Sequence, residues 1–124
     1  ARTLGRIRWR PGDALEFAGR YLSEPKAHVH FEAPARPAAR TRFAAAAARR
    51  GLEMDARARL LHARGRFFLN GEEVAARGAC AAWLRKLADS RRLATTAGAP
   101  AAFVELAREW HARGYLHYGE ETNP

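Results

Sequence analysis

Arg66-Phe67-Phe68-Leu69-Asn70-Gly71-Glu72 is the stretch of sequence that decides the fold, because an apolar run ends here in an Asn-Gly pair. Asn-Gly is a strong signal for a tight turn between antiparallel strands. We therefore expect strands at 66–69 and 72–74, and a preceding strand at 59–63 that joins them near Arg64-Gly65. Because side chains alternate along a strand, Phe67 and Leu69 face one side and Phe68 the other. Both faces of this ribbon therefore need apolar cover.

Four segments have the spacing of helices that could supply this cover. The first begins with Asp13 as its N-cap and ends at Glu24-Pro25, since the residue before a proline avoids the helical region. The others span 38–50, closed by Gly51, then 79–88, and finally 101–113, closed by Gly114. Apolar residues in the last helix recur at i, i+3, i+4 and i+7, which predicts one buried stripe.

Short strands at 52–54, 91–93 and 115–118 are also expected, and 27–32 leans toward an extended conformation. Together these elements predict a helix-rich α+β fold of the winged-helix type, with three helices packed on a small antiparallel sheet and an N-terminal helical arm. We expect an arm at 1–33, a winged-helix domain at 34–118 and a tail at 119–124. The predicted core residues are Phe43, Leu61, Phe67, Leu69, Trp83, Leu84, Leu87, Phe103, Leu106, Trp110 and Leu116.

Length and composition exclude several classes of protein. The chain has 124 residues, of which 48% are hydrophobic and 28% charged, which is typical of one globular domain. Its longest uncharged run, Leu93–Val104, is shorter than the ~20 apolar residues of a membrane-spanning helix. The single cysteine, Cys80, allows no internal disulfide and favours a reducing, cytoplasmic location. No secretory signal is expected, and a start at Ala1 rather than Met suggests a fragment.

The positive charge lies in the first half of the chain. Residues 1–66 hold 15 cations and 6 acidic residues, whereas residues 67–124 hold 7 of each, so the formal net charge of +9 arises entirely before residue 67. A partner that reads charge, such as RNA, DNA or an acidic protein surface, should meet that half first. The candidate basic face consists of Arg36, Arg40, Arg42, Arg49, Arg50, Arg57, Arg59, Arg64 and Arg66.

The last predicted helix argues against DNA reading of the usual winged-helix kind. A recognition helix carries excess Lys and Arg, but here Arg108 and Arg113 are balanced by Glu105 and Glu109. A metal site is also not expected. His28, His30 and Glu32 match the ligand types of a non-haem iron centre, but such centres lie inside barrels of many strands, which this chain is too short to form. We expect no catalytic, cofactor-binding or metal-ligating residue in the chain.

Several segments together resemble the C-terminal part of bacterial cupin (JmjC-type) ribosomal oxygenases, the ribosomal protein arginine hydroxylases. They are Tyr21-Leu22-Ser23-Glu24-Pro25-Lys26 followed by Phe31 and Pro34, then Arg66–Glu72, Leu84 with Leu87–Leu93, and Trp110 with Gly114-Tyr115-Leu116. The resemblance spans Asp13–Tyr118. It implies the end of a helical dimerisation module followed by a non-catalytic winged helix. The iron(II) and 2-oxoglutarate of the parent enzyme would be held by an upstream cupin domain.

The resemblance implies an architectural role and help in presenting a ribosomal protein substrate, with a homodimer as a further possibility. Two alternatives remain open. One is a free-standing nucleic-acid-binding regulator that uses the basic first half. The other is an interaction or dimerisation module without a ligand, which an exposed apolar strip around Leu15, Tyr21 and Leu22 would support.

Overall fold

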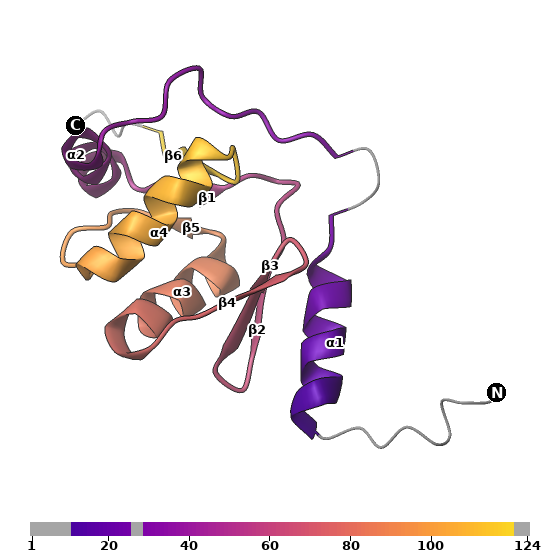
Figure 1. Ribbon diagram of the computed structural model, residues 1–124. Helices are drawn as coiled ribbons and strands as arrows, with labels where there is room; N and C mark the ends of the chain where they lie inside the picture. Colours follow the sequence, from indigo (N-terminus) through magenta and orange to yellow (C-terminus); the bar gives the residue numbers. More distant parts are fainter. Residues whose placement is uncertain (1–10, 26–28, 121–124) are drawn as a thin grey trace.

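The computed structural model describes residues 11–25 and 29–120, which form a helix-rich α+β fold (Figure 1). The elements in chain order are α1 (Pro11–Ser23), α2 (Arg40–Arg50), β1 (Leu52–Met54), β2 (Leu60–Ala63), β3 (Arg66–Leu69), β4 (Glu72–Val74), α3 (Gly78–Ser90), β5 (Arg92–Leu93), α4 (Ala101–Ala112) and β6 (Leu116–Tyr118). The predicted fold class is confirmed, and most element boundaries agree within two residues.

The Asn-Gly turn forms as predicted. Strands β2, β3 and β4 make one antiparallel sheet in which Leu69 lies opposite Glu72. Asn70 and Gly71 both have positive φ angles, 49° and 91°, which is the backbone conformation that a tight two-residue hairpin turn needs. Arg59 N–H donates to Asn70 Oδ1 at 2.9 Å and so ties the turn to the start of β2.

A second antiparallel sheet has the strand order β5-β1-β6. Leu52 of β1 lies opposite Leu93 of β5 and Tyr118 of β6. The strands thus divide between two small sheets, whereas the sequence suggested one. The reason is that β1 pairs only with strands that return after α3 and α4, far along the chain, and not with the neighbouring hairpin.

The core lies between the two sheets and helices α2, α3 and α4. Eight of the predicted core residues are buried: Phe43, Phe67, Leu69, Leu84, Leu87, Phe103, Trp110 and Leu116. Trp83 and Leu106 are only partly buried at its rim. The prediction for Leu61 was wrong, because its side chain is 37% exposed. Leu60, its neighbour in β2, occupies the core instead, and alternation along the strand turns Leu61 away.

Helix α1 covers the other face of the hairpin. Phe68 is 1% exposed beneath it, and Figure 1 shows α1 lying along the hairpin sheet. Gly71 N–H donates to Ser23 Oγ at 2.8 Å, and Arg20 Nη1 donates to Gly71 O at 3.5 Å. The helix ends at Ser23 as predicted, but it begins at Pro11, so Asp13 lies in its first turn and is not the N-cap. The domain boundary near residue 34 stays a prediction.

The segment 29–39 connects α1 to α2 without regular secondary structure. The expected extended stretch at 27–32 therefore forms no strand over residues 29–32, and its first two residues lie outside the described chain. The segment passes over the end of α4, where a Cβ added to Gly114 would lie 2.6 Å from Glu32 O. Phe31 packs edge-on against Tyr115, with ring centroids 4.8 Å apart. We call residues 29–39 the strap.

Candidate functional site

The nine arginines of the predicted basic face do not form one surface. Five lie on the strap and α2: Arg36, Arg40, Arg42, Arg49 and Arg50. Arg57 and Arg59 lie in the loop between β1 and β2, Arg64 in the hairpin turn and Arg66 in β3. Figure 1 shows α2 at the opposite end of the molecule from α1 and the hairpin. The structure therefore divides these arginines between separate regions, and their role as an interaction face stays a prediction.

The hairpin arginine with the most contacts is neutralised by carboxylates. Arg66 Nε and Nη2 donate to both oxygens of Glu73, at 2.8 and 2.7 Å, and Nη2 also lies 3.2 Å from Glu16 Oε1 on α1. These hydrogen bonds raise the pKa of Arg66 and lower those of Glu73 and Glu16. This arginine therefore holds α1 on the hairpin and contributes little net charge to the surface.

Arg57 likewise forms an ion pair with a carboxylate, that of Asp55. Its Nε and Nη2 donate to the two oxygens of Asp55 at 2.9 and 3.1 Å, and His117 Nε2 lies 2.7 Å from Oδ2. The Arg57 guanidinium holds the pKa of Asp55 well below its usual range. The guanidinium also lies over the Phe31 ring, 5.8 Å from its centroid.

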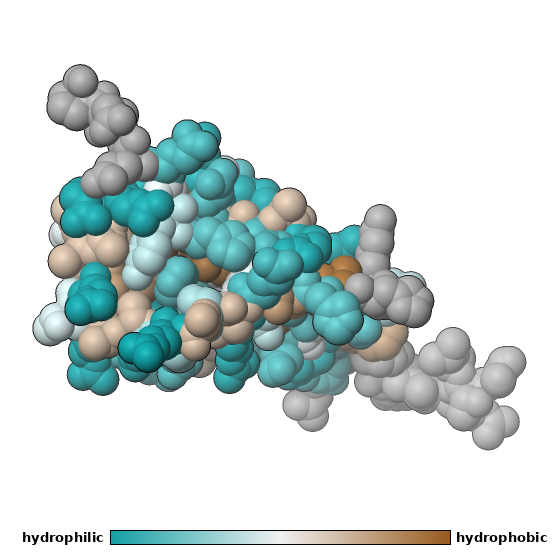
Figure 2. Space-filling model, turned by 90° about the horizontal axis from the view of Figure 1, so that it is seen from above, coloured by the Kyte–Doolittle hydropathy of each residue, from teal (hydrophilic) through white to brown (hydrophobic). Residues whose placement is uncertain are grey.

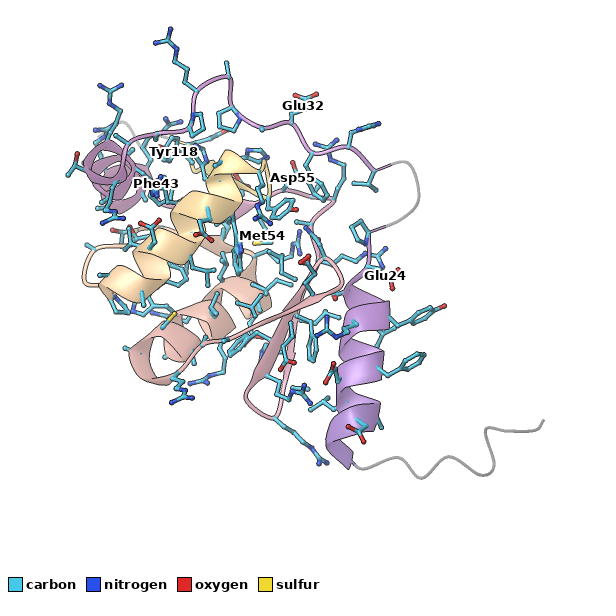
Figure 3. All side chains as sticks on the ribbon, in the orientation of Figure 1. Glu24, Glu32, Phe43, Met54, Asp55 and Tyr118 are labelled. Atoms are coloured by element: carbon cyan, nitrogen blue, oxygen red, sulfur yellow. The ribbon has the colours of Figure 1, made fainter. Side chains whose placement is uncertain are left out.

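Asp55 is therefore a structural anion at the junction of β1, β6 and the strap. Figure 3 shows it between the segment that bears Glu32 and the hairpin. Arg91 Nη2 donates to the backbone oxygens of Asp55 and Ala58, at 2.8 and 3.0 Å, and fastens α3 to the same place. With its oxygens engaged by Arg57 and His117, Asp55 is held as a carboxylate and is a poor acid or base at neutral pH.

Helix α4 occupies the position expected of a recognition helix, but it is built into the core. It contacts α2, α3 and β6, and it buries Phe103, Ala107, Trp110 and His111. Arg108 on its surface donates to Glu105 at 2.6 Å, and Arg40 of α2 lies 3.0 Å from the same carboxylate. These contacts leave α4 without a row of unpaired cations for a DNA groove.

Helix α1 presents an apolar outer side. Phe17, Tyr21 and Leu22 are 61%, 66% and 57% exposed, and the rings of Phe17 and Tyr21 stack with centroids 6.2 Å apart. Of the strip whose exposure would support an interaction module, Tyr21 and Leu22 are exposed and Leu15 is partly covered. The sequence analysis did not include Phe17 in this strip. Contiguous exposed apolar side chains of this size are typical of an interaction surface.

A shallow groove between α3 and β5 was not predicted. It is lined by Trp83, Lys86, Asp89, Ser90, Arg92, Leu93, Ala94 and Thr95 and has a volume of about 530 Å³. Trp83, predicted as a core residue, is only partly buried. The signal that could have revealed the groove is the pair Trp83 and Lys86, one helical turn apart, because this spacing lets the lysine ammonium lie over the indole ring.

A family model described as ROXA-like winged helix matches residues 6–117, which is most of the chain. The chain belongs to the ROXA-like winged helix family. This ROXA-like winged helix has no match among curated proteins. The part of the chain that the structure describes contains no helix long and apolar enough to cross a membrane.

The same fold occurs as one part of a larger protein in several solved structures. A structure of YcfD, a ribosomal oxygenase from Escherichia coli, is 18% identical to this ROXA-like winged helix, with a TM-score of 0.73. A second YcfD structure, in complex with cobalt and 2-oxoglutarate, gives the same values. Each match covers 94% of this chain and 33% of the YcfD chain, so the winged helix spans about a third of these relatives. A third YcfD structure has 20% identity and a TM-score of 0.72 over 93% of this chain and 32% of its own.

The described residues of this ROXA-like winged helix do not fit an iron centre. Residues 11–25 and 29–120 contain no group of three or more His, Cys, Asp or Glu side chains placed to hold a metal ion. His30 and Glu32 are both exposed on the strap, and His28 lies outside the described residues. No step of an oxidation is therefore assigned to the side chains described here.

Proposed function

We propose that this chain is the non-catalytic winged-helix domain of an iron(II)- and 2-oxoglutarate-dependent cupin protein hydroxylase that modifies an arginine of a ribosomal protein. The observation that carries the proposal is the family match over residues 6–117, together with a fold shared with one third of YcfD. YcfD structures with cobalt and 2-oxoglutarate or succinic acid support an oxygenase parent. A cytoplasmic location is part of the proposal.

In this proposal the metal and the cosubstrate belong to an upstream cupin domain. The contribution of the winged helix is architectural. The ion pairs of Arg66 with Glu16 and Glu73 and the bond from Gly71 to Ser23 seat α1 on the hairpin. Because α1 is fixed in this way, the upstream domain is held in a constant position relative to the winged helix. This constant position helps to present the protein substrate.

We assign the exposed apolar side of α1 to contact with a second copy of the protein. Phe17, Tyr21 and Leu22 lie on the side of α1 that faces away from the hairpin, and a helix face of this kind can pack on its own copy about a two-fold axis. The resemblance, which begins at Asp13, implies that the arm at 1–33 is the end of a helical dimerisation module and supports the same partner.

The coding sequence upstream of Ala1 and the activity of its product test the enzymatic part. We expect a strand-rich segment with a His-x-Asp motif and a distant His, and a longer protein that uses O2. One oxygen atom of O2 enters succinate as 2-oxoglutarate loses CO2, and the other is added to an arginine. The isolated 124-residue chain should do neither. Stoichiometric iron binding with 2-oxoglutarate turnover by the isolated chain would overturn the proposal, and absence of any upstream reading frame would favour a free-standing regulator.

Sedimentation equilibrium tests the dimer contact. The triple variant F17S/Y21S/L22S should be monomeric at concentrations where the parent chain self-associates. A variant that starts at Pro34 is a poorer test, because removal of α1 uncovers Phe68 and strips Gly71 of its partner. Replacing exposed Leu61, on the hairpin, with Ser is the matched control. A triple variant that associates as strongly as the parent chain contradicts this contact.

A further inference from the structure

The groove between α3 and β5 combines an aromatic ring with cations. The Trp83 ring is held on the core by Phe103, with centroids 5.7 Å apart, and the Lys86 ammonium lies 4.8 Å from the Trp83 centroid. Arg92 is exposed on β5 and also lines the groove. Ser90 is the last residue of α3, and its Oγ lies 2.6 Å from Lys86 O and 2.7 Å from Arg92 O. These contacts hold the groove wall in place.

One wall of the groove is joined to the C-terminal end of α2. Thr95, which lines the groove, donates from Oγ1 to Ala48 O at 2.6 Å. A Cβ added to Gly51, the residue that ends α2, would lie 2.0 Å from Leu93 O, so the backbones of α2 and the groove wall are in direct contact. Figure 1 shows the segment after β5 running beside α2.

The outer side of α2 extends the positive charge. Arg42 and Arg49 are both exposed and are seven residues apart, which places them on one face of the helix about 10.5 Å apart along its axis. The residues between them on that face are alanines, which allow a partner to approach closely. Residues 33–52 contain five arginines and no acidic residue. Figure 2 shows hydrophilic side chains beside weakly hydrophobic ones at this end of the molecule.

Basic side chains lie beside the carboxylates near this surface. Asp89, at the groove, lies 2.8 Å from His62 Nε2. Glu53 stands opposite Arg92 on one side and His117 on the other in the strand register, so it shares a face with both. Glu105 is engaged by Arg108 and Arg40. Arg50 is drawn inward, where it donates to Gly119 O and lies over the Tyr118 ring.

We propose that Arg42 and Arg49, with the groove residues Trp83, Lys86 and Arg92, form a binding surface for single-stranded nucleic acid. Such surfaces pair a basic track for the phosphates with an aromatic ring on which a base stacks. A stacked base takes the place of Lys86 over the Trp83 ring and frees its ammonium for a phosphate. The surface excludes α4, so it differs from major-groove reading. An acidic protein is the less favoured partner, because carboxylates would bind the cations but would not stack on the partly exposed Trp83 ring.

Fluorescence anisotropy with a labelled oligouridylate and the matching oligothymidylate, over a potassium chloride series, tests the proposal on the 124-residue chain. Both strands should bind, because the surface reads phosphates and base faces. The double variant R42Q/R49Q should weaken binding roughly tenfold. It should also make the slope of log affinity against log salt shallower by about 1.4, since each phosphate neutralised on a single strand contributes about 0.7.

The matched control is R64Q/R85Q, which removes two exposed arginines from other surfaces and leaves the same net charge. It should bind within twofold of the parent chain. Tryptophan fluorescence should be quenched on binding, and W83L should lose that quenching while circular dichroism confirms the fold. Because Trp83 packs on Phe103, W83F is a second variant that keeps a ring and should retain binding.

Three results overturn the proposal. They are no salt-dependent binding of either oligonucleotide, equal weakening by R42Q/R49Q and R64Q/R85Q, and equally tight binding of a labelled polyglutamate of the same charge. The last result would show that the surface reads charge alone and takes an acidic protein. None of these measurements involves the proposed oxygenase parent, so they succeed or fail independently of it.

Discussion

Gly19 of α1 lies so close to the Phe68 ring that a Cβ built on it would be 2.3 Å from two ring carbons. Gly19 is buried in the middle of a helix, where glycine is intrinsically unfavourable, and its missing side chain is what allows α1 to cover the hairpin. The helix therefore approaches the hairpin closely at Gly19, and a hydrogen bond from Gly71 to Ser23 also joins the two.

Gly19→Ala should destabilise the protein although alanine is the better helix former. The intrinsic gain is about 1 kcal/mol, but overpacking against a buried ring costs about 1–3 kcal/mol, and both α1 and the hairpin are held by other contacts. We expect a lower free energy of unfolding in urea and faster amide exchange in α1. The same substitution in an F68L background should be neutral or stabilising. If Gly19→Ala stabilises the parent chain, the close contact is wrong.

Gly114→Ala and Gly98→Ala form a matched pair that isolates the strap contact. The two glycines have similar φ angles, 83° and 87°, so both variants carry the same left-handed backbone strain. A Cβ at Gly114 would lie 2.6 Å from Glu32 O, whereas a Cβ at Gly98 meets nothing within 4 Å. Gly114→Ala should lower the melting temperature clearly further, with an extra loss of about 1–3 kcal/mol. Equal losses would mean that the strap does not seat on Gly114.

Asp55→Asn should cost about 1–3 kcal/mol at pH 7, because it removes the charge that Arg57 and His117 engage. The pKa of Asp55 is lowered from its ordinary value of 3.8, so its contribution is complete above that value and is lost as the pH falls below it. The difference between the parent chain and the variant, measured by urea unfolding, should therefore shrink below about pH 4. A difference that stays constant to pH 3 contradicts the ion pair.

His111 predicts a second pH effect near neutrality. Burial among apolar groups lowers its pKa below the ordinary 6.5, and its Nδ1 lies 2.9 Å from Leu116 O, as expected for a neutral ring that donates there. As the pH falls below 6.5, the unfolded chain takes up a proton that the folded ring resists, so stability drops by at most about 1.4 kcal/mol per pH unit. His111→Gln should flatten this slope between pH 5 and pH 7, as measured by urea unfolding at a series of pH values. A variant with the same slope as the parent chain contradicts the burial of a neutral His111 ring.

Local signals in the sequence were sufficient to predict most of the elements. The Asn70-Gly71 turn, the apolar stripe of α4 and the proline after Glu24 each act within a few residues, where backbone geometry is fixed by the residue type. The same local character explains the error at Asp13. Its capping potential is real, but Pro11 also suits the first turn of a helix, and the helix extends to it.

Charge could be counted from the sequence but not assigned to a surface. The sequence does not distinguish the four arginines at 42, 49, 57 and 66. In the structure, Arg57 forms an ion pair with Asp55, and Arg66 forms ion pairs with Glu73 and Glu16. Arg42 and Arg49 are exposed on α2. Glu16 and Arg66 are 50 residues apart, and only the docking of α1 brings them together. The groove at Trp83 depends in the same way on the contact of Thr95 with Ala48.

The sequence by itself thus determined the helices, the hairpin, the excess of positive charge and the need for apolar cover on both faces of the hairpin. The tertiary structure alone decided that the strands form two sheets, that α1 supplies the cover, and which of the described arginines are exposed on the surface. The physical reason is range: turn and helix preferences act between near neighbours in the chain, whereas strand partners, ion pairs and grooves depend on distances that exist only after folding.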